Sequence, residues 1–190
     1  MSDLLHCVKK TNVLSKEGSV KALVLAGMGS HFCTGGISID TKGERSHPRL
    51  EILSQIVITM RKLPIPTLAI IHGKVIGGGL ALSLAADWRV CTAKTTPNCG
   101  NLPRGMSCIM NLSLALPLTV GRAFANQVYL EDTVLNSTDA TKFGLVNHVE
   151  PSKQDAEIYA HRIAESLVLS QQFEHGPVSY ICGENASHIS

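Results

Sequence analysis

The chain has 190 residues and a formal net charge of +2; 44% of its residues are hydrophobic and 17% are charged. Lys and Arg are scattered along the chain, so no concentrated positive field is expected, and we expect neither nucleic acid nor a membrane as a partner. The low share of charged residues instead favours association with further subunits that cover apolar surface.

The length indicates a single domain, and the cysteine pattern indicates that its thiols are reduced. A chain of this size is expected to form a single core. Its six cysteines form no Cys-x-x-Cys pair, and several lie in apolar runs, where a free thiol behaves as a small core residue. The opening MSDLLHCVKK has no long apolar centre, and no stretch reaches the ~20 apolar residues of a membrane span. We therefore expect a soluble, cytoplasmic protein.

Short apolar runs alternate with helical patterns in the first half of the chain. VKALVLAG (20–27), TLAIIHG (67–73) and WRVCTA (88–93) are typical of strands buried on both faces. Apolar residues at helical spacing predict a helix over 49–63, which two prolines then end. LALSLAAD (80–87) predicts a second, buried helix. The alternation predicts an α/β fold with a parallel sheet.

The second half continues the same pattern. A helix is predicted over 120–130, a short helix with Ser137 as its N-cap and Gly144 after its end, a strand at LVNHV, and an amphipathic helix over 152–169. The last twenty residues have no clear period. We therefore expect a domain over residues 1–170 and a loosely ordered tail over 171–190.

Three consecutive glycines lie within VIGGGLALSLAAD (75–87), between an apolar run and a predicted helix. One interpretation is a tight strand-to-helix turn with close packing. The other is chemical, because unhindered N–H groups at a helix start can hold an oxygen that gains negative charge during a reaction. The triplet by itself favours the turn, since glycine turns are far commoner than oxyanion holes.

Three blocks of sequence together favour the chemical interpretation of the glycines. LVLAGMGSHFCTGGISID (23–40), PIPTLAIIHGKVIGGGLALSLAADWRV (64–90) and TKFGLVNHVEP (141–151) resemble the crotonase, or enoyl-CoA hydratase/isomerase, superfamily in order and spacing. The resemblance implies a ββα spiral fold, with helices packed on buried sheet. The family usually has more chain at both ends, so we expect a fold truncated at both ends.

The resemblance also implies an activity. Members bind an acyl thioester, of CoA or of an acyl carrier protein, and polarise its carbonyl with two backbone N–H groups; carried over, these belong to Gly36 and Gly78. Ile37, Ser38 and Asn101 would then contact the substrate. The thioester is itself the reactant, so no further cofactor and no metal is expected. Family members usually assemble as homo-trimers or hexamers, so the resemblance implies such an assembly here.

This sequence departs from the hydratases of that family at both catalytic acids. Ala81 and Asn101 stand where two glutamates would add and remove protons, and neither side chain can transfer a proton at neutral pH. Ser38 stands where the decarboxylases of polyketide β-branching cassettes have a lysine. Even so, HFCTGG with both glutamates lost looks closer to those polyketide-pathway relatives than to fatty-acid oxidation enzymes.

Other polar residues are weaker candidates. His31 and His72 are the first to test as proton donors, although a loop or packing histidine is the better explanation of each. Arg104 and Cys108 lie on the loop expected to roof the acyl pocket, but nothing in the sequence places a base beside the Cys108 thiol. Asp87 fits a structural aspartate better than a catalytic one.

Two hypotheses remain open. The first is an acyl-thioester enzyme that forms an enolate in the oxyanion hole and carries out decarboxylation or isomerisation rather than hydration. The second is a non-catalytic, degenerate relative that binds a thioester or a partner subunit.

Overall fold

The structure is a computed structural model that describes residues 1–35, 47–170 and 178–182. Its main sheet contains five strands in the order β6-β4-β2-β1-β7, and every neighbouring pair is parallel. These strands are β1 (Ala22–Ala26), β2 (Thr67–Ile71), β4 (Trp88–Thr92), β6 (His148–Glu150) and β7 (Val178–Cys182). Every residue of β1 and β2 is buried, which explains their almost entirely apolar sequences.

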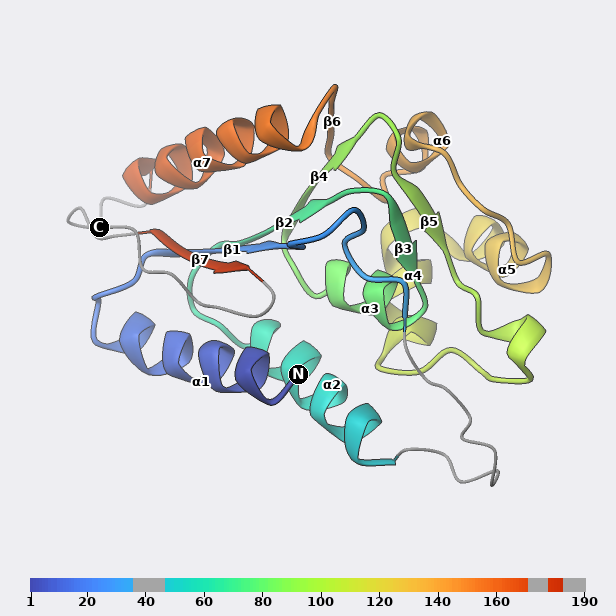
Figure 1. The fold of residues 1–190 in the computed structure, drawn as a ribbon, viewed down its shortest axis with the longest axis horizontal. Helices are drawn as coiled ribbons and strands as arrows, with labels where there is room; N and C mark the ends of the chain where they lie inside the picture. The colour runs from blue at the N-terminus through green and yellow to red at the C-terminus, as the bar shows by residue number, and fades with distance from the viewer. Residues whose placement is uncertain (36–46, 171–177, 183–190) are drawn as a thin grey trace.

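Helices cover both faces of this sheet (Figure 1). On one face, α7 (Lys153–Ser170) packs Ala156, Ala160 and Ala164 against side chains of β1, β2 and β4. On the other face lie α1 (Ser2–Lys16) and α2 (His47–Met60), which run beside each other. The small alanines on α7 allow this helix to approach the sheet closely.

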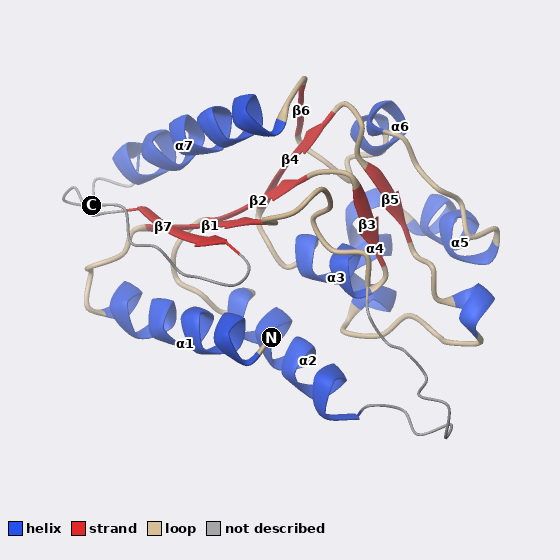
Figure 2. Cartoon of the chain, in the orientation of Figure 1, coloured by secondary structure: helices blue, strands red, loops and turns tan. Residues whose placement is uncertain are grey.

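A second, smaller region follows the sheet at the ends of β2 and β4 (Figure 2). Its two strands, β3 (Lys74–Ile76) and β5 (Thr96–Asn98), are parallel. The surrounding helices are α3 (Gly78–Ser83), the 3₁₀ turn η1 (Leu102–Arg104), α4 (Leu112–Val120), α5 (Arg122–Leu130) and α6 (Ser137–Lys142). This region and α2 together form the walls of the cavity described below.

The α/β fold with a parallel sheet is confirmed, whereas three local predictions need correction. The predicted helix over 120–130 begins only after Gly121, and a separate helix, α4, precedes it. The N-cap of α6 is Asn136 rather than Ser137, because the Asn136 side chain accepts from the Asp139 N–H at 2.7 Å.

The tail also differs from its prediction in one part. Residues 178–182, within the stretch expected to be loosely ordered, form strand β7 and pair with β1. The position of this strand depends on pairing with a distant part of the chain, which leaves no local periodicity to detect. The other residues of 171–190 lie outside the described part of the chain.

Asp87 has the structural role predicted for it. Its carboxylate accepts from the Thr67 N–H at 2.9 Å and from the Thr67 hydroxyl at 2.7 Å, while the Asp87 N–H donates to that hydroxyl. These bonds tie the end of the α3 segment to the start of β2.

None of the helices in the described part of the chain combines the length and the apolar character that a membrane span needs.

Candidate active site

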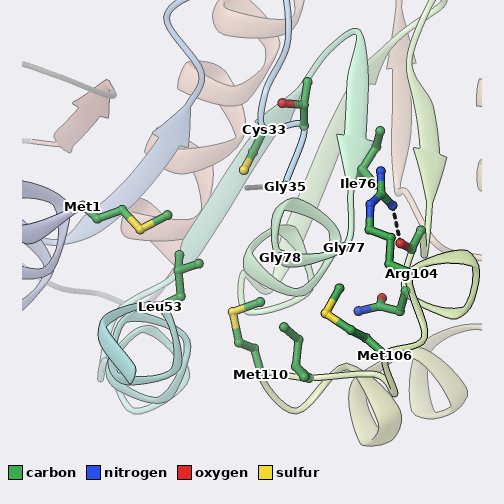
Figure 3. Close-up of a pocket in the computed structure, with 14 residues that line it drawn as sticks. Met1, Cys33, Gly35, Leu53, Ile76, Gly77, Gly78, Arg104, Met106 and Met110 are labelled. Atoms are coloured by element: carbon green, nitrogen blue, oxygen red, sulfur yellow. Dashed lines mark hydrogen bonds between the residues drawn. The ribbon is translucent and has the colours of Figure 1, made fainter. Parts of the chain in front are cut away.

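A cavity of about 270 Å³ opens where α2, α3 and the segment after β5 meet (Figure 3). Backbone from the glycine triplet forms one wall, and long apolar side chains form another. The lining residues are Met1, Cys33, Thr34, Gly35, Leu53, Ile76, Gly77, Gly78, Gly100, Asn101, Arg104, Met106, Ile109 and Met110.

Two of the three glycines are explained by conformation and packing. Gly77 has φ of +55°, which L side chains rarely adopt. Gly79 packs directly on Cys33, whose carbonyl oxygen and Cβ occupy the space that a Cβ on Gly79 would need. The interpretation of the triplet as a tight, closely packed turn therefore holds at these two positions.

Gly78 is different because nothing rigid requires a glycine there. Its φ is not positive, and the nearest neighbour of an added Cβ would be the flexible end of Met110, at 2.8 Å. Gly78 is the first residue of α3, where N–H groups have no partner inside the helix. Among the described residues no acceptor for the Gly78 N–H is found, and this residue lines the cavity. A bound oxygen could accept from it.

The second predicted N–H donor, Gly36, lies outside the described residues, as do Ile37 and Ser38. The chain just before them reaches the same cavity. Cys33 accepts from the Ile76 N–H at 2.9 Å, so residues 33–35 run beside β3, and Gly35 lines the cavity together with Gly78. Only the Gly78 half of the predicted oxyanion hole is therefore described.

Asn101 also lines the cavity, whereas Ala81 does not. Asn101 is 2% exposed, and its side-chain oxygen is buried without a hydrogen-bond partner among the described residues. Leaving a buried polar atom unpaired is costly, so the arrangement is suited to a bound group that pairs with this amide. Ala81 lies on α3 and is buried in the hydrophobic core of the protein. Neither position supplies a proton-transfer group.

The segment that carries Asn101 is fixed by Asp132, which lies in the turn after α5. The Asp132 carboxylate accepts from the Gly100 N–H at 2.8 Å, and the Asn98 amide donates to the Asp132 carbonyl at 2.9 Å. After Asn101, η1 and its hydrogen bonds bring Arg104 back to donate to the Gly100 carbonyl, as the dashed line in Figure 3 marks. This wall of the cavity is thus held by polar contacts at both of its ends.

The two candidate histidines do not line this cavity. His31 is exposed, and its Nδ1 accepts from the Lys74 N–H at 3.2 Å. His72 is buried, and its Nε2 lies 2.8 Å from the Gly29 carbonyl oxygen, to which it donates. Burial lowers the pKa of His72 from its ordinary value, against the opposing effect of the Gly29 bond. Both histidines join β2 and the turn after it to the segment before Cys33.

Two thiols, Cys99 and Cys108, flank Asn101 in the sequence. Cys99 is fully buried and Cys108 partly buried. The Cys99 thiol lowers the pKa of Cys108, and the Cys108 thiol, together with burial, raises that of Cys99. All five cysteines whose side chains are described are free. Neither thiol of this pair lines the cavity.

Sequence reasoning missed the apolar wall, which consists of Leu53, Met106, Ile109 and Met110. The sequence does indicate that Leu53 is buried, because Leu53 belongs to the helical apolar pattern of α2. No feature of the sequence indicates the position of Met110, which depends on a left-handed backbone at Met110 and Asn111, with φ of 53° and 64°. Neither residue is a glycine, so the sequence gives no hint of that turn.

Comparisons with known proteins identify the family of this chain. The sequence model of the enoyl-CoA hydratase/isomerase family matches residues 4–174. A probable enoyl-CoA hydratase of Mycobacterium leprae, echA12, is 30% identical over 158 residues, which are 77% of this chain and 54% of that protein. 4-Chlorobenzoyl coenzyme A dehalogenase-1 of Arthrobacter sp is 31% identical over 191 residues, covering 97% of this chain and 69% of that protein.

A solved structure shows the same fold. The putative enoyl-CoA hydratase of Streptomyces coelicolor A3(2) superposes with a TM-score of 0.76 at 30% identity, covering 88% of this chain and 62% of the other. The fold is therefore that of the crotonase superfamily. The chain belongs to the enoyl-CoA hydratase/isomerase family, and it spans about half the length of the M. leprae relative. Its relatives include a probable hydratase and a dehalogenase, so membership alone does not specify the reaction.

Proposed function

We propose that this protein binds an acyl thioester in the cavity at the start of α3 and stabilises the enolate form of its carbonyl. The observation that carries the proposal is Gly78, a residue whose N–H is unpaired among the described residues at a position where packing does not demand glycine. In the resemblance to the family, Gly36 supplies the second donor. An oxyanion-hole donor is worth about 3–4 kcal/mol of transition-state stabilisation.

The reaction proposed is decarboxylation or isomerisation rather than hydration. Adding water needs a base to activate it and an acid to deliver a proton, each worth roughly 10²- to 10⁴-fold. Ala81 and Asn101 supply neither. Loss of CO₂ from a β,γ-unsaturated acid thioester needs no water: the electrons of the breaking C–C bond enter the thioester, the enolate oxygen accepts from the N–H groups, and carbon then takes up one proton.

A second candidate function is binding without turnover. It is favoured by a specific observation: of the described residues that line the cavity, none is a histidine or a carboxylic acid. In that case the protein holds a thioester or a partner subunit through the same cavity and catalyses nothing.

The two candidates are separated by incubating the purified protein with crotonyl-CoA and with 3-methylglutaconyl-CoA and following absorbance and mass. Release of CO₂ or a shifted double bond supports the enzyme. Binding of both thioesters without any product supports the non-catalytic candidate. Robust hydration of crotonyl-CoA would contradict the proposed reaction.

A variant tests why hydration is absent. Replacing Ala81→Glu together with Asn101→Glu restores carboxylates at both positions where the family's hydratases have them. We expect hydration of crotonyl-CoA to rise from background by at least about tenfold, since each acid–base group contributes roughly 10²-fold or more when well placed. Each single variant serves as a control, because one carboxylate alone cannot act as both acid and base in separate positions.

Other parts of the proposal rest on the family resemblance. The thioester is carried by CoA or by the phosphopantetheine of an acyl carrier protein, and the polyketide-pathway likeness of HFCTGG favours the carrier protein. No cofactor other than the thioester takes part. His31 and His72 remain the first proton donors to test by alanine substitution, although among the described residues neither reaches the cavity lining.

A further inference from the structure

The cavity has one charged side chain in its described lining. The apolar side chains of Leu53, Met106, Ile109 and Met110 also line it. Figure 3 shows Arg104 across the cavity from Leu53, and Asn101 belongs to the lining as well. No Asp or Glu is among the described lining residues. A cavity with a guanidinium and no acid favours an anion over a neutral or cationic group.

Arg104 is held in place but is not neutralised. It donates from Nη1 to the Gly100 carbonyl, while a guanidinium has five N–H donors in all. No carboxylate of the described residues forms an ion pair with it. Arg104 follows Asn101 through η1, which ends at Gly105 in a left-handed conformation, and the Asp132 contact fixes Gly100. The remaining donors are therefore presented from an ordered segment.

Asn101 gives an independent indication that the cavity binds a polar group. Its side-chain oxygen is buried, unpaired among the described residues, and belongs to a residue that lines the cavity. The same side-chain amide also carries two N–H donors. A carboxylate can then accept from Asn101 and from Arg104 together, as charge-assisted hydrogen bonds require.

We propose that the cavity selects acyl thioesters whose acyl chain ends in a carboxylate, which Arg104 and Asn101 bind. The inference rests on the proposed function and names its substrate class. The apolar wall then packs against the carbon chain between carboxylate and thioester. Because Arg104 stabilises the carboxylate in the ground state, this contact does not speed the loss of CO₂ from that same carboxylate. It therefore favours isomerisation over decarboxylation for such a substrate.

The test compares two saturated thioesters of equal chain length, glutaryl-CoA and pentanoyl-CoA, by titration calorimetry. They differ in a terminal carboxylate. We expect glutaryl-CoA to bind about tenfold more tightly, a modest gain because Arg104 is exposed to solvent and salt screens it. The preference should shrink as the ionic strength rises.

Variants then assign the preference to its residue. Arg104→Gln should weaken the binding of glutaryl-CoA more than that of pentanoyl-CoA and so remove the preference, and Arg104→Lys should keep part of it. Arg122→Gln is the matched control, because Arg122 is an exposed arginine at the start of α5 and does not line the cavity. If Arg104→Gln fails to fold, the comparison of the two thioesters on the unmodified protein still decides.

Three results would overturn the inference. Equal binding of the two thioesters refutes carboxylate selection while leaving thioester binding intact. Equal weakening of glutaryl-CoA and of free CoA by Arg104→Gln shows that the arginine holds nucleotide phosphates instead. Failure of free CoA and both thioesters to bind refutes CoA-thioester binding, and the inference with it.

Discussion

Gly78 and Gly79 are neighbours whose replacement should have different effects. An alanine at 79 must displace the Cys33 backbone, so we expect Gly79→Ala to lower the free energy of unfolding by about 1–3 kcal/mol, the usual range for overpacking. At 78 the added methyl presses only on the flexible end of Met110 and makes an ordinary contact with Leu53, and alanine is the better helix former by roughly 0.5–1 kcal/mol. Gly78→Ala should therefore change stability by less than about 1 kcal/mol. Urea denaturation measures both, and equal losses would contradict the assignment.

His72 makes stability depend on pH in a defined direction. Its pKa in the folded protein is lowered by burial, with Lys153 and His31 lowering it further and the Gly29 bond and Glu157 opposing them. The unfolded chain has the ordinary value near 6.5 and so binds more protons below that pH. Stability is therefore complete above about 6.5 and falls as the pH is lowered through that value.

The corresponding measurement is the melting temperature between pH 7.5 and 5.5. The unmodified protein should lose stability across this range, and His72→Asn should lose less, because asparagine does not titrate. The variant's own stability at neutral pH is its reference, since it also removes the bond to Gly29. Parallel curves for the two proteins would show that His72 is not the group responsible.

The residues of the site were predictable to different degrees. Gly78 and Asn101 follow from the family resemblance, because their spacing along the chain is fixed by a strand, a helix and a strand. The same spacing placed Arg104 on the roof of the pocket. The separate roles of the three glycines did not follow, since they depend on Cys33 and Met110, which tertiary packing brings next to α3.

The segment from β5 to α4 behaves as one structural element of the site, and Asp132 is its anchor. Asp132→Ala leaves the Gly100 N–H without its partner and puts an alanine at a φ of +48°. We expect a loss of about 1.5–3 kcal/mol in the free energy of unfolding, the range for a hydrogen bond to a charged group. Weaker thioester binding should accompany it, because Gly100 and Asn101 would no longer be fixed.

Asp132→Asn is the matched control for this anchor. Asparagine tolerates a left-handed backbone and keeps an oxygen that can accept from the Gly100 N–H, so its loss should be clearly smaller. Thermal and urea denaturation of the two variants provide the comparison. Equal losses of stability in both variants, or no loss in either, would show that the Asp132 carboxylate does not hold the cavity wall.

Among the strands, the longer ones could be predicted from the sequence and the shorter ones could not. The strands β1, β2 and β4 are five residues each and bury every position or nearly so, which leaves a clear apolar run. The strands β3 and β5 have three residues each, too few for any period to show. The helix α4 was missed for another reason: Pro117 lies inside it, and its sequence LSLALPLTV has almost no polar face.

For the whole molecule, exposed apolar side chains indicate assembly of several chains. Several large apolar side chains of the smaller region are exposed in the single chain: Leu114, Leu118, Leu130 and Val134. Leu114 and Leu118 are four residues apart and so lie on one side of α4. Exposed apolar surface of this kind, together with a charged fraction of 17%, is the composition expected of a chain whose surface is partly covered by copies of itself.

We therefore predict a homo-trimer or hexamer, with the exposed side of α4 in contact with another chain. Light scattering should give three or six times the 20.3 kDa of one chain. Leu118 is 72% exposed, so Leu118→Lys should leave the fold of a single chain unchanged but place a charge in the contact, and the mass should fall. Ile158→Lys is the control, because Ile158 is similarly exposed but lies on α7, across the sheet from α1 and α2. A stable, well-behaved monomer of the unmodified chain would contradict the prediction, and loss of assembly in Ile158→Lys alone would move the contact from α4 to α7.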